Sequence, residues 1–171
     1  MPSVAPSDAP SFMPSAVVSL ITGSAVASQI NGNAAWVAID GNTNGNFESG
    51  SVTHTAVGLC NDWFPGTAGN GGTMNPWWKV DLGFLATVKR VKIWNRTDCP
   101  SCAIRLTGAK IELLDNNMNI VEDAEITIGQ TVNPASEEFD FGAVSGIRTV
   151  RVQIYGCGIL SIAELQVYGY Q

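Results

Sequence analysis

The sequence contains few basic residues, a single histidine and no long apolar run. Nine lysines and arginines stand against fifteen aspartates and glutamates, which gives a formal net charge of −6. This acidic balance argues against nucleic acid or an anionic membrane as a partner. No apolar stretch reaches the length of a membrane-spanning helix, and no signal-peptide core follows Met1. We therefore expect a mature form or a fragment of a longer product.

Sustained helical periodicity is also lacking, whereas alternating apolar and polar residues are frequent. Residues 88–94 and 148–155 alternate as strands with one buried face do. Eighteen glycines are consistent with many turns. The candidate strands lie at about 16–22, 77–83, 88–94, 109–114, 118–121, 124–128, 136–141, 148–155 and 162–168. With no convincing helix among them, the sequence predicts an all-β sandwich.

The chain divides into a spacer and one domain. Residues 1–15 repeat proline and serine. Because proline fixes φ and lacks an N–H donor, a disordered or extended segment without a core is expected there. Residues 16–171 remain, which is enough for a single domain with a substantial core.

The four cysteines, an even number, suit two disulfides and an oxidising, extracellular compartment. Cys99 and Cys102 also have the spacing of a redox-active pair. A thioredoxin-like site, however, needs a βαβ setting and a helix N-terminus, and the sequence indicates neither. No motif pairs two acidic residues for hydrolysis. The sequence therefore predicts a binding protein and not an enzyme.

One stretch, Ile93 to Leu106, concentrates polar groups that could bind a ligand. Arg96 and Asp98 follow directly after the alternating run at 88–94, so they lie where that strand ends and a loop begins. Arg105 adds a second guanidinium group, and a disulfide between the two cysteines would make the loop rigid. Guanidinium groups beside a carboxylate form a donor-rich patch, which indicates ligand binding.

Other segments have more than one interpretation. Residues 40–46 contain two Asx-Gly-Asn turns, whose oxygens suit Ca²⁺ but which are also common without a metal. His54 is the only histidine, and a lone histidine is more often structural than functional. The long loop at 56–76 carries Trp63 and Phe64, which suit either a small satellite core or a platform for stacking a sugar.

Five segments, taken in their order and spacing, resemble the F-type lectin (fucolectin) domain. They read AIDGN from Ala38, GSVTHT from Gly50, NPWWKVDLG from Asn75, NRTDC from Asn95 and LSIAELQVYG from Leu160. The resemblance covers about residues 17–169 and places the chain among the discoidin-like, galactose-binding-like folds. It implies an eight-stranded antiparallel jelly-roll β-sandwich. Loops at one end of such a domain hold a sugar, usually α-L-fucose, with a calcium ion close by.

The resemblance also implies which residues contact the sugar. His54 matches the family's histidine. Arg96 and Asp98 match its Arg-x-Asp motif, and Arg105 matches the basic residue that follows. Here six residues instead of four separate Asp98 from Arg105, because a two-residue insertion separates two cysteines that are adjacent in the family. Asp98 is expected to orient Arg105. The implied sugar-binding set, in which Phe47 and Trp63 would face the C6 methyl group, is Phe47, His54, Trp63, Arg96, Asp98, Cys99, Cys102 and Arg105.

A structural calcium site is implied by the same resemblance. Three carbonyls, two carboxylates and one hydroxyl would provide the oxygen ligands that Ca²⁺ prefers. These ligands would come from Val37, Asn42, Ala163, Asp40, Glu164 and Ser51. The cysteines are expected to pair as Cys99 with Cys102 and, near the binding end, Cys60 with Cys157.

The resulting expectation is a calcium-containing lectin module that recognises terminal α-L-fucose or a related sugar with an axial 4-hydroxyl group. It would be secreted and act outside the cell, at the cell surface or in the cell wall, within a multi-module protein whose partners are glycans. The alternative is a non-lectin adhesion or assembly module on the same scaffold. The changed spacing before Arg105 supports that alternative.

The sequence Asn95-Arg96-Thr97 is an N-glycosylation sequon. We predict that it carries no glycan, because a glycan there would crowd the adjacent Arg96. Intact-mass measurement on natively expressed protein checks this prediction. A glycan found on Asn95 would contradict it.

Overall fold

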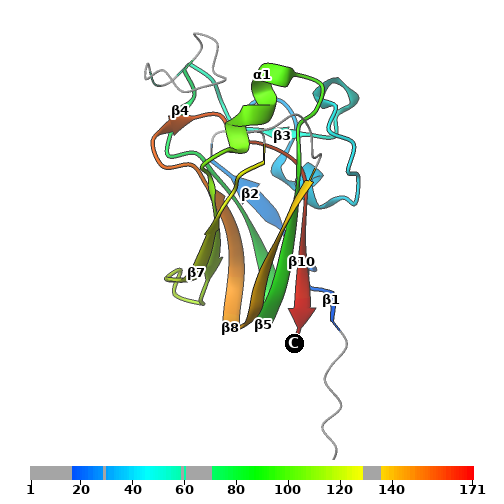
Figure 1. Cartoon of the computed structure of the whole chain (residues 1–171), viewed down its shortest axis with the longest axis vertical. Coiled ribbons are helices and arrows are strands. Elements are labelled where there is room, and N and C mark those ends of the chain that lie inside the picture. Colours follow the sequence, from blue (N-terminus) through cyan, green and yellow to red (C-terminus); the bar gives the residue numbers. More distant parts are fainter. Residues whose placement is uncertain (1–16, 29, 59, 61–70, 129–135) are drawn as a thin grey trace, which may run out of the picture.

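The computed structural model describes residues 17–28, 30–58, 60, 71–128 and 136–171 of the chain. Long strands run between the two ends of the molecule, and the short helix α1 lies at one end (Figure 1). Within the described residues the strands are β1 (Val18–Ser19), β2 (Ala25–Ala27), β3 (Thr53–His54), β4 (Thr73–Met74), β5 (Trp77–Asn95), β6 (Lys110–Leu114), β7 (Ile120–Glu125), β8 (Ser136–Gln153), β9 (Cys157–Gly158) and β10 (Ser161–Tyr170). The helical segments are η1 (Ala35–Ile39), η2 (Phe47–Ser49), α1 (Pro100–Ala103) and η3 (Ile104–Leu106).

The strands β5 and β8 are long enough to belong to both layers of the sandwich. The first half of β5 pairs with β2 and with the end of β8, which is followed in the same layer by β6 and β7. The second half of β5 pairs with β10, which also pairs with β1 and β3. The strands β4 and β9 form a separate pair. All these pairs are antiparallel, and the predicted all-β jelly-roll sandwich is confirmed.

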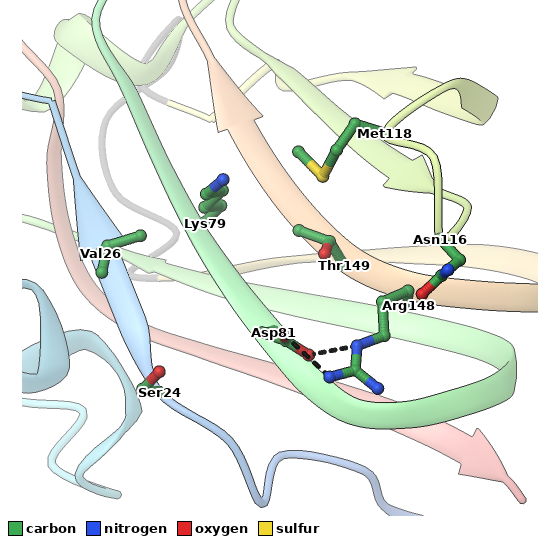
Figure 2. Close-up of a pocket in the computed structure, with 8 residues that line it drawn as sticks. All are labelled: Ser24, Val26, Lys79, Asp81, Asn116, Met118, Arg148 and Thr149. Carbon is green, nitrogen blue, oxygen red and sulfur yellow. Dashed lines mark hydrogen bonds and ion pairs between the residues drawn. The ribbon is translucent and has the colours of Figure 1, made fainter.

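A glycine and an ion pair mark the place where β5 passes from one layer to the other. Gly83 has a φ of 86°, in the left-handed region that favours glycine. The carboxylate of Asp81 accepts the N–H of Gly83 at 2.8 Å and pairs with Nε of Arg148, on β8, at 2.7 Å. Figure 2 shows this ion pair beside a hollow of the outer surface. The pair therefore ties β5 to β8 where their ladder is interrupted.

The core lies between the two layers and follows the alternation of the sequence. Trp78, Val80 and Leu82 are fully buried, whereas Trp77 and Lys79 lie on the outer face. The indole N–H of Trp78 donates to the carbonyl oxygen of Ala35 at 2.9 Å, so this side chain also holds η1 against the core. Burying one large apolar side chain contributes about 1.5–3 kcal/mol. The sequence-based expectation that one of the paired tryptophans faces the core is thus met.

The bounds of several strands differ from the sequence-based expectation. The expected strands at 77–83 and 88–94 are two halves of β5, because its ladder with β8 continues beyond the bend. The expected strands at 118–121 and 124–128 are replaced by β7, because Met118 occupies a turn with a φ of 66°.

A short α-helix, which the sequence did not indicate, follows the end of β5. Pro100 stands in its first turn, where backbone N–H groups have no partner within the helix, so the missing N–H of proline costs no hydrogen bond. The helix continues directly into η3, whose last residue, Leu106, is fully buried. This buried leucine anchors the insertion that separates Cys99 from Cys102.

Two sequence features fall outside the described residues, namely the expected spacer at 1–15 and the aromatic pair Trp63 and Phe64. Within the part of the chain that the structure describes, no helix is both long and apolar enough to cross a membrane.

Two disulfides join the cysteines in the expected pairs. Cys60 is bonded to Cys157 of β9, with their Cα atoms 6.0 Å apart and a sequence separation of 97. Cys99 is bonded to Cys102, with their Cα atoms 5.1 Å apart and a separation of 3.

These two disulfides should stabilise the fold to different extents. Because the entropy that a cross-link removes from the unfolded chain grows with loop length, the long loop corresponds to about 4.7 kcal/mol and the short one to about 2 kcal/mol. We predict that the double change Cys60→Ser, Cys157→Ser lowers the free energy of unfolding about twice as much as Cys99→Ser, Cys102→Ser. Urea denaturation measures both losses. Equal losses, or a larger loss for the short loop, would contradict the prediction.

Candidate functional site

A polar loop built from successive Asx turns leads into the candidate site. In each turn a side-chain Oδ1 accepts the backbone N–H two residues later, at 2.8–3.1 Å. The accepting residues are Asp40, Asn42, Asn44 and Asn46. The carbonyl oxygen of Gly45 accepts the N–H of Thr97 at 2.8 Å, and a Cβ at Gly45 would lie 2.6 Å from the carbonyl oxygen of Asn95. Glycine therefore allows this loop to lie against the end of β5.

Phe47, the first residue of η2, lies between two of the predicted sugar-binding side chains. Its ring centroid is 5.4 Å from that of His54. The guanidinium carbon of Arg96 lies 4.6 Å from the same ring, within the range of a cation–π contact. The phenyl ring therefore brings the histidine and the arginine together around one apolar surface.

His54 is held by β3 and is buried, with 7% of its surface exposed. Its Nε2 lies 3.1 Å from Nη1 of Arg105. Since arginine only donates, Nε2 must act as the acceptor. Burial first, and then the charge of Arg105 with a smaller effect of Arg96, lower the pKa of His54 from 6.5 to about 4, against an opposing effect of the Thr55 backbone. The ring is therefore neutral at pH 7.

Arg105 reaches His54 in spite of the longer spacing from Asp98. It lies on η3 and is half-buried. Burial, followed by the nearby charge of Arg96, lowers the pKa of Arg105. His54 contacts Arg105 directly and Arg96 through the ring of Phe47, so the structure brings the three side chains into one cluster.

Asp98 has a different partner from the one that was predicted. Its carboxylate binds Arg96 with both oxygens, Nε to Oδ1 at 2.7 Å and Nη2 to Oδ2 at 3.1 Å. This hydrogen bonding is the main cause that lowers the pKa of Asp98. Asp98 therefore fixes the guanidinium plane of Arg96 above Phe47, whereas Arg105 is placed by η3 and His54.

Asn95, which the sequence did not single out for the site, connects β5 to the inserted helix. Its Nδ2 donates to the carbonyl oxygen of Ala103 at 2.7 Å, and its Oδ1 accepts the N–H of Arg96 at 2.8 Å. Only 3% of Asn95 is exposed. A glycan would have to be attached to this buried Nδ2, which gives a structural reason for the predicted empty sequon. The sequence pattern could have pointed to Asn95, because it follows Val91 and Ile93 at alternate positions of the strand and so lies on the same buried face.

The residues predicted to bind calcium are partly brought together. Glu164 is 2% exposed, and its Oε2 accepts the N–H of Gly41 at 3.2 Å. Asp40, Gly41 and Glu164 line one hollow of the surface. Burial, together with the negative charge of Asp40, raises the pKa of Glu164. Among the described residues neither carboxylate forms an ion pair with a basic side chain. A buried carboxylate beside a second one is then suited to a cation.

The remaining predicted ligands add oxygens but no further charge. Ser51 is buried and its hydroxyl donates to the carbonyl oxygens of Asn44 and Asn46, the latter at 2.8 Å. Val37 and Ala163 are buried, and Asn42 is exposed. No group of three or more His, Cys, Asp or Glu side chains gathers around one point in the described part of the chain. The donor set is therefore one of carbonyls and two carboxylates, which are hard oxygen ligands.

A separate hollow lies on the outer face formed by β2, β5 and β8 (Figure 2). Its lining is Ser24, Val26, Lys79, Asp81, Asn116, Met118, Arg148 and Thr149. None of these residues belongs to the predicted sugar or calcium sets. The charge of Arg148 is already matched by Asp81, so the cluster around Phe47 remains the candidate site.

Sequence and structural relatives support the same family. Residues 37–152 match the NedA-like, galactose-binding domain family. The chain belongs to this family. Fucolectin-1 of Anguilla japonica is 33% identical over 133 residues, which are 76% of this chain and 65% of that protein. The chain thus spans less than two thirds of the length of this curated relative.

Two solved structures that are more than 25% identical to this chain share its fold over most of its length. A Streptococcus pneumoniae fucose binding module is 30% identical, with a TM-score of 0.71 over 92% of this chain and 99% of that one. A serum fucolectin of striped bass, Morone saxatilis, is 32% identical, with a TM-score of 0.69 over 89% of this chain and 48% of that one. The predicted F-type lectin domain is therefore confirmed.

The charge state of the histidine in this F-type lectin domain can be measured directly, because His54 is the only histidine. We predict a pKa of about 4 by NMR titration, and a higher pKa in Arg105→Ala because a neighbouring positive charge is removed. Arg90→Ala, which removes an arginine of the outer face paired with Glu138, is the control and should leave the pKa unchanged.

The sign of the effect on stability follows from the same pKa. The unfolded chain takes up the His54 proton near pH 6.5, whereas the folded chain does so only near pH 4. The contribution of His54 to stability is therefore complete above pH 6.5 and is lost as the pH falls towards 4. A pKa of 6 or above in the native protein would contradict this account.

Proposed function

We propose that the domain is a lectin module that binds terminal α-L-fucose, or a related sugar with an axial 4-hydroxyl group. The observation that carries this proposal is the cluster in which His54 and Arg96 lie at the ring of Phe47 and Arg105 contacts His54. Two guanidinium groups offer fixed forks of N–H donors, which suit the hydroxyl and ring oxygens of a sugar. The phenyl ring would provide the apolar surface for the C6 methyl group.

The proposed role of each residue follows from its contacts. Asp98 orders Arg96, and His54 accepts one N–H of Arg105, so both donor groups are oriented before the ligand arrives. Such pre-ordering lowers the entropic cost of binding. A single sugar held mainly by these groups should bind with a Kd on the order of 10⁻³ to 10⁻⁵ M, or roughly 4–7 kcal/mol. Nothing in this arrangement requires a chemical step, so the proposed activity is binding alone.

Relatives and disulfides support the setting in which the domain would act. Two structural relatives are described as a fucose binding module and a serum fucolectin. The two disulfides suit an oxidising, extracellular environment. We infer that the domain is secreted and forms part of a larger protein in which several weak sites act together on glycans, at the cell surface or in the cell wall.

Titration with L-fucose tests the proposed site. We predict that Arg96→Ala and Arg105→Ala each weaken binding by about 10-fold to 100-fold, because each removes a charged hydrogen-bond donor. Arg90→Ala, an arginine change on the outer face, should bind as the unchanged protein does. Isothermal titration calorimetry measures the affinities, and thermal melts check that each variant is folded. If no fucoside on a glycan array binds and Arg96→Ala changes nothing, the non-lectin adhesion module becomes the better reading.

We also propose a structural calcium ion held by Asp40, Glu164, Ser51 and the carbonyls of Val37, Asn42 and Ala163. What supports it is the buried carboxylate of Glu164 beside the exposed carboxylate of Asp40, together with a loop that is rich in oxygen donors. A bound calcium ion would offset the charge of both carboxylates. Because η2 follows directly on this loop, the ion would also stabilise the position of Phe47.

Removal of calcium should lower the melting temperature. We predict that EDTA lowers it, that Ca²⁺ restores it, and that free Ca²⁺ at 100 times its Kd stabilises the fold by about 2.7 kcal/mol. The increase in melting temperature that Ca²⁺ produces should be larger at pH 7 than at pH 5. Without a cation the raised pKa of Glu164 gives stability that is complete below 4.5 and is lost as the pH rises. Glu164→Gln should abolish the calcium effect and Glu122→Gln, on the exposed β7, should preserve it. An unchanged melt at saturating Ca²⁺ would rule out the ion.

A further inference from the structure

Two buried polar atoms of the candidate site and its surroundings have no hydrogen-bond partner in the part of the chain that the structure describes. His54 Nδ1 and Ser161 Oγ are buried, and neither has a hydrogen-bond partner among the described residues. Their residues are 7% and 0% exposed. Buried donors and acceptors are nearly always satisfied, either by protein groups or by ordered water. Both atoms therefore need an explanation.

The pairing of β3 with β10 places these two residues directly opposite each other. Ser161 is the register partner of His54, and the neighbouring pair is Ile162 with Thr53. Opposed residues of an antiparallel pair project from the same face, with Cβ atoms about 4.5–5.5 Å apart. The serine hydroxyl rotates and can both donate and accept. The two atoms are not hydrogen-bonded to each other as they stand. A rotation of the serine side chain, or one bridging water, would connect them.

The contact with Arg105 indicates which atom of the ring carries the proton. Nη1 of Arg105 lies 3.1 Å from Nε2, and arginine only donates, so Nε2 presents its lone pair. A neutral imidazole then has its proton on Nδ1. That N–H lies on the buried side of the ring, where the Thr55 backbone, which raises the pKa of His54, makes no hydrogen bond to Nδ1 of good geometry, and where the hydroxyl of Ser161 can be the acceptor.

We propose that Ser161 is a positioning residue of the sugar site. Its hydroxyl accepts the Nδ1 proton of His54, directly or through one ordered water, and so fixes the tautomer in which Nε2 accepts from Arg105. Loss of this hydroxyl allows the proton to move to Nε2, and Arg105 then loses its acceptor. The effect on sugar affinity rests on the proposed function, whereas the effect on the tautomer does not.

The tautomer can be read by NMR on protein labelled with ¹⁵N-histidine, since every signal comes from His54. We expect the Nδ1–H tautomer in the unchanged protein, a mixture of tautomers in Ser161→Ala, and recovery in Ser161→Thr. Thr73→Val is the matched control. It removes another buried hydroxyl without a partner, which is in register with Gly158 and not with His54, and it should leave the tautomer unchanged.

L-fucose titration gives the second readout. Ser161→Ala should weaken binding on the order of ten-fold, with recovery in Ser161→Thr and no change in Thr73→Val. An Nε2–H tautomer in the unchanged protein, or an unchanged tautomer in Ser161→Ala, overturns the proposal. If Ser161→Ala does not fold, Ser161→Thr and Ser161→Val are compared instead, because threonine and valine are equal in size and differ only in the hydroxyl group. Identical tautomers in these two variants overturn the proposal. A tautomer shift in a protein that binds no fucoside supports the role of Ser161 and sinks only the proposed function.

Discussion

The register of β10 sets the geometry of the candidate site. This strand pairs with β3 on one side and with β5 on the other, and consecutive residues make the two connections. Ser161 is opposite His54, and Ile162 is opposite Asn95, the residue before Arg96. The histidine and the strand end that carries the arginine are therefore held side by side by backbone hydrogen bonds. A slip of one residue would turn His54 to the other face of the sheet and disperse the cluster.

The charges in the cluster suit a neutral ligand. Two guanidinium groups close together repel each other, and the charge of Arg96 contributes to the lowered pKa of Arg105. Asp98 already pairs with Arg96, and burial keeps His54 uncharged. A protonated His54 would instead place a third positive charge beside Arg105. The cluster thus combines two strong donor groups with a neutral imidazole, an arrangement that suits the hydroxyl groups of the sugar we propose as its ligand.

The sequence predicts the scaffold better than it predicts the contacts within the site. Alternation alone indicates that Val91 and Ile93 face the core, and the motif segments identify His54, Arg96 and Arg105. The partner of Asp98 could not be predicted, because it depends on how the chain folds after Cys99. Ser161 is equally hidden, since its importance comes from pairing with a residue more than a hundred positions away. Side-chain partners across strands depend on register, which a single sequence specifies only indirectly.

The two-residue insertion lengthens the loop without moving Arg105 away from the site. An extended chain advances about 3.3 Å per residue, whereas helical turns advance only about 1.5–2.0 Å. Because α1 and η3 coil residues 100–106, the extra residues add little length between Asp98 and Arg105. The Cys99–Cys102 disulfide and the bond from Asn95 to Ala103 hold this coil against the end of β5. The changed spacing between Asp98 and Arg105 was the main sequence argument for a non-lectin module. Because Arg105 still contacts His54, that spacing no longer supports the non-lectin alternative.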